Sequence, residues 1–478
     1  MIKKDIDKLD IVLVGSGLSA LSFINSYNNK KKLTVISPDF YKSINKDKKN
    51  YHLTNYLPSQ MNRNDSYKID NYFNLNDLKV ESGCRVLGSL ETGGLSKYWG
   101  LQMDTDLRDL HVLKVKIKNL IVKNFFSLID CFNLRGTLKI NEKIAYSNDY
   151  KVSKQFETLL KESHKDFYVQ KPLLAFIGNK KKNLRELSDI NESKDKLNST
   201  NYLNLLKKNI SFINYAVKKI YKRNGKLYIV CEDSNQNTKI YNIKKIIFAA
   251  GTIATTKLIL DYLEIEREVK IKHHLRLISV FLARKKILNP LKFTPSLIQI
   301  KNKEKKIQYS GDIRPGNDQI TKSILEISWI FYFIKKIITI LKNYLIFSNI
   351  LLDSKFSNLY IKKSSKLTEF KIYIKKQNSK ALLRTAQKKI YNFLLLNKII
   401  FPFFYANYFP GVGADYHYFG TIPMSDKRKK LSVNMNCALK NHKNIFIIDG
   451  SVFDFKYNKY PLGIIMANAA RVAKYLSK

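Results

Sequence analysis

Cysteine is scarce in this chain, whose 478 residues include only four. Cys84, Cys131, Cys231 and Cys437 lie far apart and form no Cys-x-x-Cys pair or other metal-ligand spacing. This spacing argues against a disulfide scaffold and against a structural zinc site. We expect a reducing, cytoplasmic environment and no bound metal.

A long apolar run is also missing. The first apolar run after the basic N-terminus, Ile11–Val14, is too short for a signal-peptide core, so no secretion is expected. The most apolar region, Ile324–Leu352, is interrupted by lysines and falls short of the ~20 apolar residues that a membrane-spanning helix needs. Two interpretations stay open for it: a helix lying in the membrane interface, or a buried helix of a substrate domain.

Acidic residues are outnumbered, since 39 Asp and Glu stand against 85 Lys and Arg, a formal net charge of +46. Lys, Ile, Asn and Tyr are abundant together, as in chains encoded by AT-rich DNA, which accounts for much of this charge. The basic residues are spread along the chain and form no single tail. This distribution favours an anionic substrate or a peripheral contact with the inner face of the membrane, and we expect no nucleic-acid partner.

A glycine turn near the start of the chain is typical of a dinucleotide site. Ile11–Val14 reads as a buried parallel strand, and the sequence Gly15-Ser16-Gly17-Leu18-Ser19-Ala20 follows it directly. Gly15 allows a tight turn, Gly17 lets the backbone approach a pyrophosphate, and Ala20 permits close packing of helix on strand. The acidic residue that usually holds the ribose is replaced by Ser37, whose hydroxyl can still form a hydrogen bond.

Two further segments complete the candidate binding site. In the stretch Gly93-Gly94-Leu-Ser96-Lys-Tyr-Trp99-Gly100, small residues permit close contact between the backbone and a planar or anionic ligand. Near the C-terminus, the apolar run 445–448 ends in Asp449-Gly450, which looks like the other half of the same site. The cofactor is therefore predicted to be held by both ends of the chain.

His417 is the candidate base. It lies beside a glycine turn in Tyr416-His417-Tyr418-Phe-Gly420, and an imidazole with a pKa near ~6.5 can accept the proton of an alcohol while hydride leaves the adjacent carbon. The aromatic residues Tyr98, Trp99, Tyr416 and Tyr418 are candidates to line the pocket, or they belong to the packing core.

Five motifs occur in a fixed order along the chain. They are Gly15-x-Gly-x-x-Ala20, Gly93-Gly-x-Ser-x-x-Trp99-Gly, Ala249-Ala250-Gly251-x-Ile-x-Thr255, His417-x-x-Gly-Thr and Asp449-Gly-Ser-Val-Phe453. In this order they resemble the glucose-methanol-choline (GMC) family of flavin oxidoreductases. The glycine and tryptophan motif and the Met466-Ala-Asn-Ala ending look most like members associated with bacterial surface-polysaccharide synthesis.

The resemblance implies an FAD cofactor and assigns further residues. Val217 would lie near the adenine end, Ala250 and Gly251 would contact the cofactor, and Pro461-Leu462 would lie against the flavin pyrimidine edge. His417 matches the family's active-site histidine. Two departures leave its catalytic partner open: Tyr460 stands directly before the proline, with Asn458 two residues earlier, and Asp454 replaces the usual proline after Phe453. His273-His274 resembles a position where the chain returns over the flavin.

These observations predict an α/β fold, with a Rossmann-like FAD-binding domain and a discontinuous α+β substrate domain. The first is predicted to comprise residues 1–100, 201–272 and 411–478, and the second residues 101–200 and 273–410. The expected function is oxidation of a CH-OH group of a sugar or related alcohol, with FAD reoxidised by an unidentified electron acceptor. Two alternatives remain: a membrane-surface enzyme acting on a lipid-linked alcohol, and a degenerate flavoprotein fold that serves as a basic scaffold.

Overall fold

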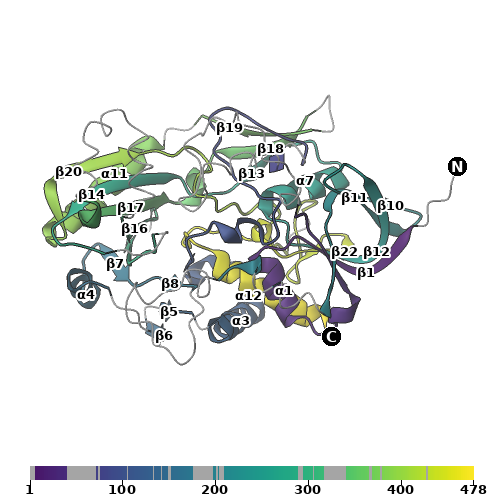
Figure 1. Ribbon diagram of the computed structural model, residues 1–478, viewed down its shortest axis with the longest axis horizontal. Helices are drawn as coiled ribbons and strands as arrows, with labels where there is room; N and C mark the ends of the chain where they lie inside the picture. Colours follow the sequence, from purple (N-terminus) through teal and green to yellow (C-terminus); the bar gives the residue numbers. More distant parts are fainter. Residues whose placement is uncertain are drawn as a thin grey trace.

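The computed structural model describes residues 6–39, 72–73, 76–104, 106–132, 134–140, 143–148, 152–175, 197–200, 203, 209–288, 294–304, 306–316, 341–364, 369–376, 379–426 and 429–478. Two large sheets lie at opposite ends of the molecule, and helices near the chain termini lie between and below them (Figure 1).

A parallel sheet joins the two ends of the chain. Its parallel strands lie in the order β9 (Ser211–Ile213), β2 (Leu33–Ile36), β1 (Asp7–Val14), β12 (Thr238–Phe248) and β22 (His442–Ile447). Val14 pairs with both Ile36 and Phe248, so the apolar run that was predicted as a buried strand lies at the centre of the sheet. The carboxyl ends of β1, β12 and β22 therefore lie at the same edge of the sheet.

An antiparallel extension enlarges this sheet to eight strands. β10 (Ala216–Arg223) and β11 (Lys226–Glu232) form a hairpin on β12, and β21 (Ala438–Leu439) pairs with β22. Asn224 and Gly225 both have positive φ, as expected for the tight turn of this hairpin.

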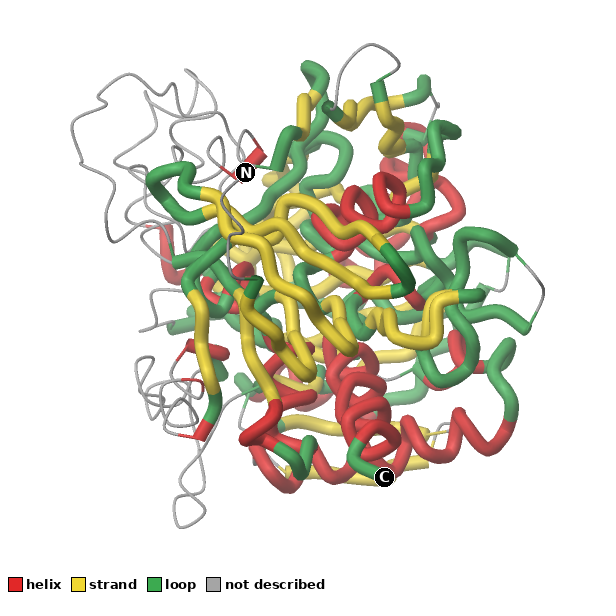
Figure 2. Tube along the Cα trace, turned by 90° about the vertical axis from the view of Figure 1, so that its right-hand side faces the viewer, coloured by secondary structure: helices red, strands yellow, loops and turns green. Residues whose placement is uncertain are grey.

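Helices cover the parallel sheet. α1 (Leu18–Ser26) packs against α12 (Leu462–Leu476), which packs against α3 (Val115–Phe132), so the first helix and the last helix lie side by side. α7 (Thr252–Tyr262) follows β12 and contacts β10. Figure 2 shows helices above and below the central strands.

The second large sheet is antiparallel and has its own core. Its six strands lie in the order β20 (Ile400–Tyr408), β14 (Arg276–Ala283), β17 (Leu345–Leu352), β16 (Tyr309–Pro315), β15 (Ile298–Asn302) and β7 (Phe167–Gln170). α11 (Lys380–Leu396) packs on β14, β17 and β20, and α4 (Lys154–Lys161) packs on β7. β15 and β16 are consecutive in the chain and pair antiparallel as a hairpin.

Smaller sheets connect these parts. A four-stranded sheet contains β13 (Val269–Ile271), β18 (Leu359–Lys363), β19 (Phe370–Ile374) and β3 (Leu78–Val80). β4 (Gln102–Met103) pairs with β8 (Leu173–Leu174), and β5 (Gly136–Ile140) pairs with β6 (Lys143–Asn148). Buried residues of β18, β19 and α3 belong to the same apolar core as β1, although the sequence assigns their segments to the substrate domain. The domain boundaries stay a prediction.

The helical interpretation of Ile324–Leu352 is wrong for its last eight residues. Leu345–Leu352 forms the strand β17, with seven of the eight residues buried, because it pairs with β14 on one side and β16 on the other. A short apolar run does not distinguish a buried strand from a buried helix. Residues 324–340 lie outside the described part. Among the described residues, no helix is long and apolar enough to cross a membrane.

Candidate active site

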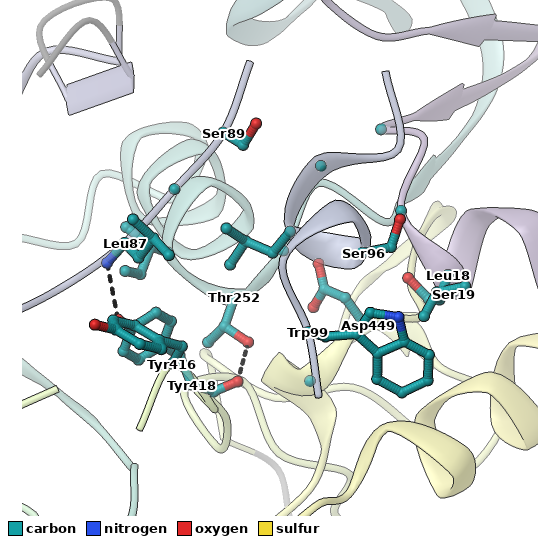
Figure 3. Close-up of a pocket in the computed structure, with 18 of the residues that line it drawn as sticks. Leu18, Ser19, Leu87, Ser89, Ser96, Trp99, Thr252, Tyr416, Tyr418 and Asp449 are labelled. Atoms are coloured by element: carbon teal, nitrogen blue, oxygen red, sulfur yellow. Dashed lines mark hydrogen bonds between the residues drawn. The ribbon is translucent and has the colours of Figure 1, made fainter. Parts of the chain in front are cut away.

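One cavity of about 370 Å³ is lined by residues from nearly all of the predicted motifs. Figure 3 shows Leu18, Ser19, Ser96, Trp99 and Asp449 together on one side of it, with Tyr416 and Tyr418 on the other. The predicted site residues that line the cavity are Gly15, Gly17, Leu18, Ser19, Ser37, Gly94, Ser96, Trp99, Val217, Ala250, Gly251, His417, Asp449, Gly450, Tyr460, Pro461 and Leu462. Ala20, Gly93 and Asn458 are not among the lining residues.

The first glycine turn is fixed between two strands. Gly15 donates its backbone N–H to Ile36 O at 2.9 Å, and Ala249 donates to Val14 O at 2.8 Å. Gly15 has φ +102°, and a Cβ at this position would lie 2.4 Å from Ala249 O. Only glycine fits this turn without strain.

The N-terminus of α1 is open toward the cavity. Gly17 is the residue before the helix, no side chain caps the helix, and its first turn contains no acidic residue. The first backbone N–H groups and the positive end of the helix dipole therefore remain available to an anionic ligand. Ala20 is fully buried in α1, which fits the predicted packing role and not ligand contact.

Ser37 and Gly93 are linked through Ser16. The hydroxyls of Ser16 and Ser37 lie 2.7 Å apart, and Gly93 donates its N–H to Ser16 Oγ at 2.9 Å. Gly93 has φ +91° and is the N-cap residue of the short helix η4 (Gly94–Lys97), so it positions this helix without lining the cavity itself. This corrects the prediction that Gly93 itself contacts the ligand.

Asp449 places a buried carboxylate at the cavity wall. It follows β22 at the carboxyl edge of the parallel sheet, and it accepts hydrogen bonds from the Thr255 hydroxyl and from both the N–H and the hydroxyl of Ser451. Burial raises the pKa of Asp449, while the hydrogen bonds oppose this shift.

His417 presents one edge of its ring to the cavity. Its side chain is 28% exposed, but Nδ1 is fully buried, so the exposed part is the opposite edge, which carries Nε2. Nδ1 lies 3.8 Å from the Asp415 carboxylate. Burial lowers the pKa of His417 to about 4, and the Asp415 charge partly opposes this. The imidazole is neutral at pH 7 and can accept a proton.

His273 and His274 both contact the Asp415 carboxylate. His274 donates its backbone N–H to the Asp415 carboxylate at 2.8 Å, and His273 Nδ1 lies 3.3 Å from the same group. Both histidines are fully buried and neither lines the cavity. These two residues therefore contact Asp415 and do not face the cavity, while the predicted return of the chain over the flavin stays a prediction.

Tyr460 and Asn458, the two candidate partners of His417, lie in different surroundings. The Tyr460 ring packs edge-on against His417 with ring centroids 5.1 Å apart, and its hydroxyl donates to the Asp312 carboxylate. Asn458 is fully buried: its Oδ1 accepts from Asp106 N–H at 2.6 Å, and its Nδ2 donates to Asp106 O and to Asp109, each at 2.7 Å. The catalytic prediction for Asn458 is corrected, because these bonds tie two segments together away from the cavity.

The aromatic candidates Tyr98, Trp99, Tyr416 and Tyr418 all line the cavity. The Tyr418 hydroxyl accepts from Leu87 N–H at 2.9 Å and donates to Gly413 O at 2.8 Å, so this ring is fixed in place (Figure 3).

Several lining residues lie outside the predicted motifs and are missed by sequence reasoning, among them Asp415 and three residues of the second sheet. Arg276, Arg314 and Asn349 come from β14, β16 and β17 of the second sheet. The only signal in the sequence for these three is a polar or charged residue within or at the start of a largely buried strand.

Comparison with solved structures identifies the architecture. The crystal structure of pyridoxine 4-oxidase from Mesorbium loti superimposes on this chain with a TM-score of 0.57, covering 98% of this chain and 99% of that one, at 11% sequence identity. The chain has the fold of that oxidase. The similarity extends over both large sheets, which confirms the predicted fold class. Searches with protein-family models and against curated proteins give no match.

Proposed function

We propose that this chain is an FAD-dependent oxidoreductase that oxidises a CH-OH group of a sugar or related alcohol. The observation that carries the proposal is a single cavity into which both the uncapped N-terminus of α1 and the exposed edge of a neutral His417 open. The first feature suits the pyrophosphate of a dinucleotide, and the second suits removal of a hydroxyl proton.

The residues that line the cavity fit FAD. The pyrophosphate would be held at Gly17 and the start of α1, where a Cβ on Gly17 would meet only Gly93 O, at 4.0 Å, and would otherwise point into open space. The Ser37 hydroxyl and Val217 would hold the adenosine end, and Asp449 would accept hydrogen bonds from hydroxyl groups of the cofactor. When bound, FAD supplies the hydride acceptor.

His417 would act as the general base. Its neutral Nε2 would take the proton of the substrate hydroxyl, and bound FAD would accept the hydride from the carbon that carries this hydroxyl, so that the alcohol would become a carbonyl compound. The Asp415 carboxylate, close to Nδ1, would stabilise the imidazolium that results. The Tyr460 hydroxyl is already used as a donor to Asp312, so we assign Tyr460 to positioning the His417 ring.

The proposal is tested by the visible absorbance spectrum of the purified protein and by its uptake of added FAD. A yellow protein whose colour is bleached anaerobically by sugars or other alcohols supports it. A colourless protein that takes up no FAD would instead indicate the scaffold alternative.

A lipid-linked alcohol remains the second candidate because of the net charge of +46. Reduction of the flavin only by alcohols presented in anionic vesicles would favour it over a sugar. The association with surface polysaccharide stays a prediction.

A further inference from the structure

Two arginines line the cavity on the side of the second sheet. Arg276 on β14 and Arg314 on β16 flank β17, which lies between these two strands and carries Asn349. Arg276 Nε donates to Asn349 Oδ1 at 2.8 Å, so the three side chains form one polar wall. His417 and Tyr460 line the same cavity.

The hydrogen bonds of both guanidinium groups go to neutral acceptors. Arg276 donates to Asn349 Oδ1 and to Ala414 O. Arg314 donates to Thr294 O, Gln102 Oε1 and the Tyr460 hydroxyl. Among the described residues, neither arginine has a carboxylate within ion-pair distance, and Arg314 Nε is buried without a hydrogen-bond partner.

Two buried carboxylates near this wall, Asp312 and Asp415, have their contacts with other groups. Asp312 accepts from the Tyr460 hydroxyl and, at 3.0 Å, from Gln102 Nε2. Asp415 accepts from His274 N–H and faces His273 and His417. Asp312 and Asp415 therefore balance the local charge from a distance without pairing with either guanidinium.

Buried or half-buried cations elsewhere in the described part of the chain differ in their pairing: Arg471 and Lys459 donate to neutral acceptors but do not line the cavity, whereas two other lysines are paired with carboxylates. Lys301 contacts Asp104, and Lys171 lies 3.0 Å from Glu157. Burial lowers the pKa of Arg276, with a smaller lowering contribution from the Arg314 charge, while Tyr416, Tyr460 and Asp415 oppose this shift. A buried cation without a partner is costly, and an anionic ligand would relieve that cost.

The absence of a side chain at Gly100 leaves room for the Arg314 guanidinium. A Cβ on Gly100 would lie 3.0 Å from Arg314 Nη1, so the last glycine of the Gly93–Gly100 motif lets the guanidinium approach the backbone. Arg314 is only 8% exposed, so its position is fixed by packing.

We propose that the substrate is an alcohol that also carries an oxyanion, a carboxylate or a phosphate, which Arg276 and Arg314 bind while its hydroxyl group lies at His417. This inference rests on the proposed function and narrows its substrate class. The planar forks of the two guanidinium groups match the oxygen geometry of both anions, and Asn349 holds the Arg276 fork in place.

The test compares Arg276→Gln and Arg314→Gln with the FAD-loaded wild type. Arg284→Gln is the matched control, because Arg284 bonds to Ile400 O and does not line the cavity. Arg276→Lys keeps the charge without the fork, and circular dichroism checks that each variant is folded. Binding of inorganic phosphate, glucuronate and glucose is measured from the perturbation of the flavin spectrum, and anaerobic flavin reduction is measured with glucose, glucuronate and glucose 6-phosphate.

We expect the oxyanions to bind more tightly than glucose, and each Gln variant to weaken them by about 10- to 100-fold, the scale of one lost charge-assisted hydrogen bond. Arg276→Lys should fall between wild type and Arg276→Gln, and Arg284→Gln should match the wild type. The anion that binds more tightly identifies the group, carboxylate or phosphate.

Equal binding of glucose and the oxyanions, or Gln variants that bind oxyanions as the wild type does, would overturn the inference and leave the proposed function intact. A protein that takes up no FAD would refute the proposed function. The role of the arginines would then be read from calorimetric titration with phosphate, in which the Gln variants should still lose binding.

Discussion

Substituting Gly15 and Gly17 separately by alanine separates effects on the free energy of unfolding from effects on FAD binding. The two glycines lie two residues apart in one turn but meet different surroundings. At Gly15, φ is +102° and an added Cβ would lie 2.4 Å from Ala249 O and 2.9 Å from Ala250 Cα, which are both backbone atoms of the adjoining turn. At Gly17, φ is −69° and the Cβ would meet nothing nearer than 4.0 Å.

The expected costs follow from this geometry. For Gly15→Ala, an alanine at positive φ costs about 1–2 kcal/mol. Displacing the turn that follows β12 adds about 1–3 kcal/mol, so we expect the free energy of unfolding to fall by about 2–5 kcal/mol in total. For Gly17→Ala, the free energy of unfolding of the apoprotein should change by less than about 1 kcal/mol.

The assay is chemical denaturation of both apoproteins, followed by titration with FAD. Gly17→Ala should fold as the wild type does and bind FAD at least about tenfold more weakly, because the methyl group occupies the space through which a pyrophosphate approaches α1. A Gly17→Ala variant with wild-type FAD affinity, or a Gly15→Ala variant as stable as the wild type, would refute this account of the turn.

Three further predictions concern Asp415 and the two residues predicted as partners of His417. In Asp415→Asn, the loss of the charge that raises the pKa of His417 should move the acid limb of flavin reduction from about pH 4 to lower pH. The same variant should slow the reaction by about 10- to 100-fold at pH 7. A pH–rate profile identical to that of the wild type would contradict an electrostatic effect of Asp415 on His417. Tyr460→Phe should reduce the flavin within about tenfold of the wild-type rate, because its hydroxyl is used by Asp312, and a loss comparable to that of a His417 variant would restore Tyr460 as a catalytic residue. Asn458→Leu should lower the free energy of unfolding by about 1–3 kcal/mol in denaturant titrations, whereas unchanged stability would argue against its structural role.

Much of the cavity wall at the carboxyl edge of the parallel sheet could be predicted because its signals are local. Val14 ends a short branched apolar run, Gly15 must follow it, and α1 begins at Leu18, so strand, turn and helix are encoded within a dozen residues. Asp449 is found by the same logic after β22. The pairing of the two chain ends follows once both motifs are assigned to one ligand.

The cavity wall formed by the second sheet could not be predicted in the same way, because it depends on tertiary pairing. Arg276 and Arg314 belong to different strands, and they reach the same wall of the cavity only because β17 pairs with both strands. The apolar run that begins near Leu345 does not show from sequence whether it forms a strand or a helix. Asn458 shows the opposite error: closeness to Tyr460 in sequence suggested a place in the cavity, but its side chain points toward Asp106 and Asp109.

The central claim is that His417 acts on an alcohol beside a flavin held in this cavity. The most direct test is the anaerobic rate of flavin reduction in wild type and His417→Ala, both loaded with equal amounts of FAD. We predict the same flavin absorbance in both proteins and a reduction rate about 10²–10⁴-fold lower in the variant. Equal reduction rates would contradict the assignment of His417 as the base.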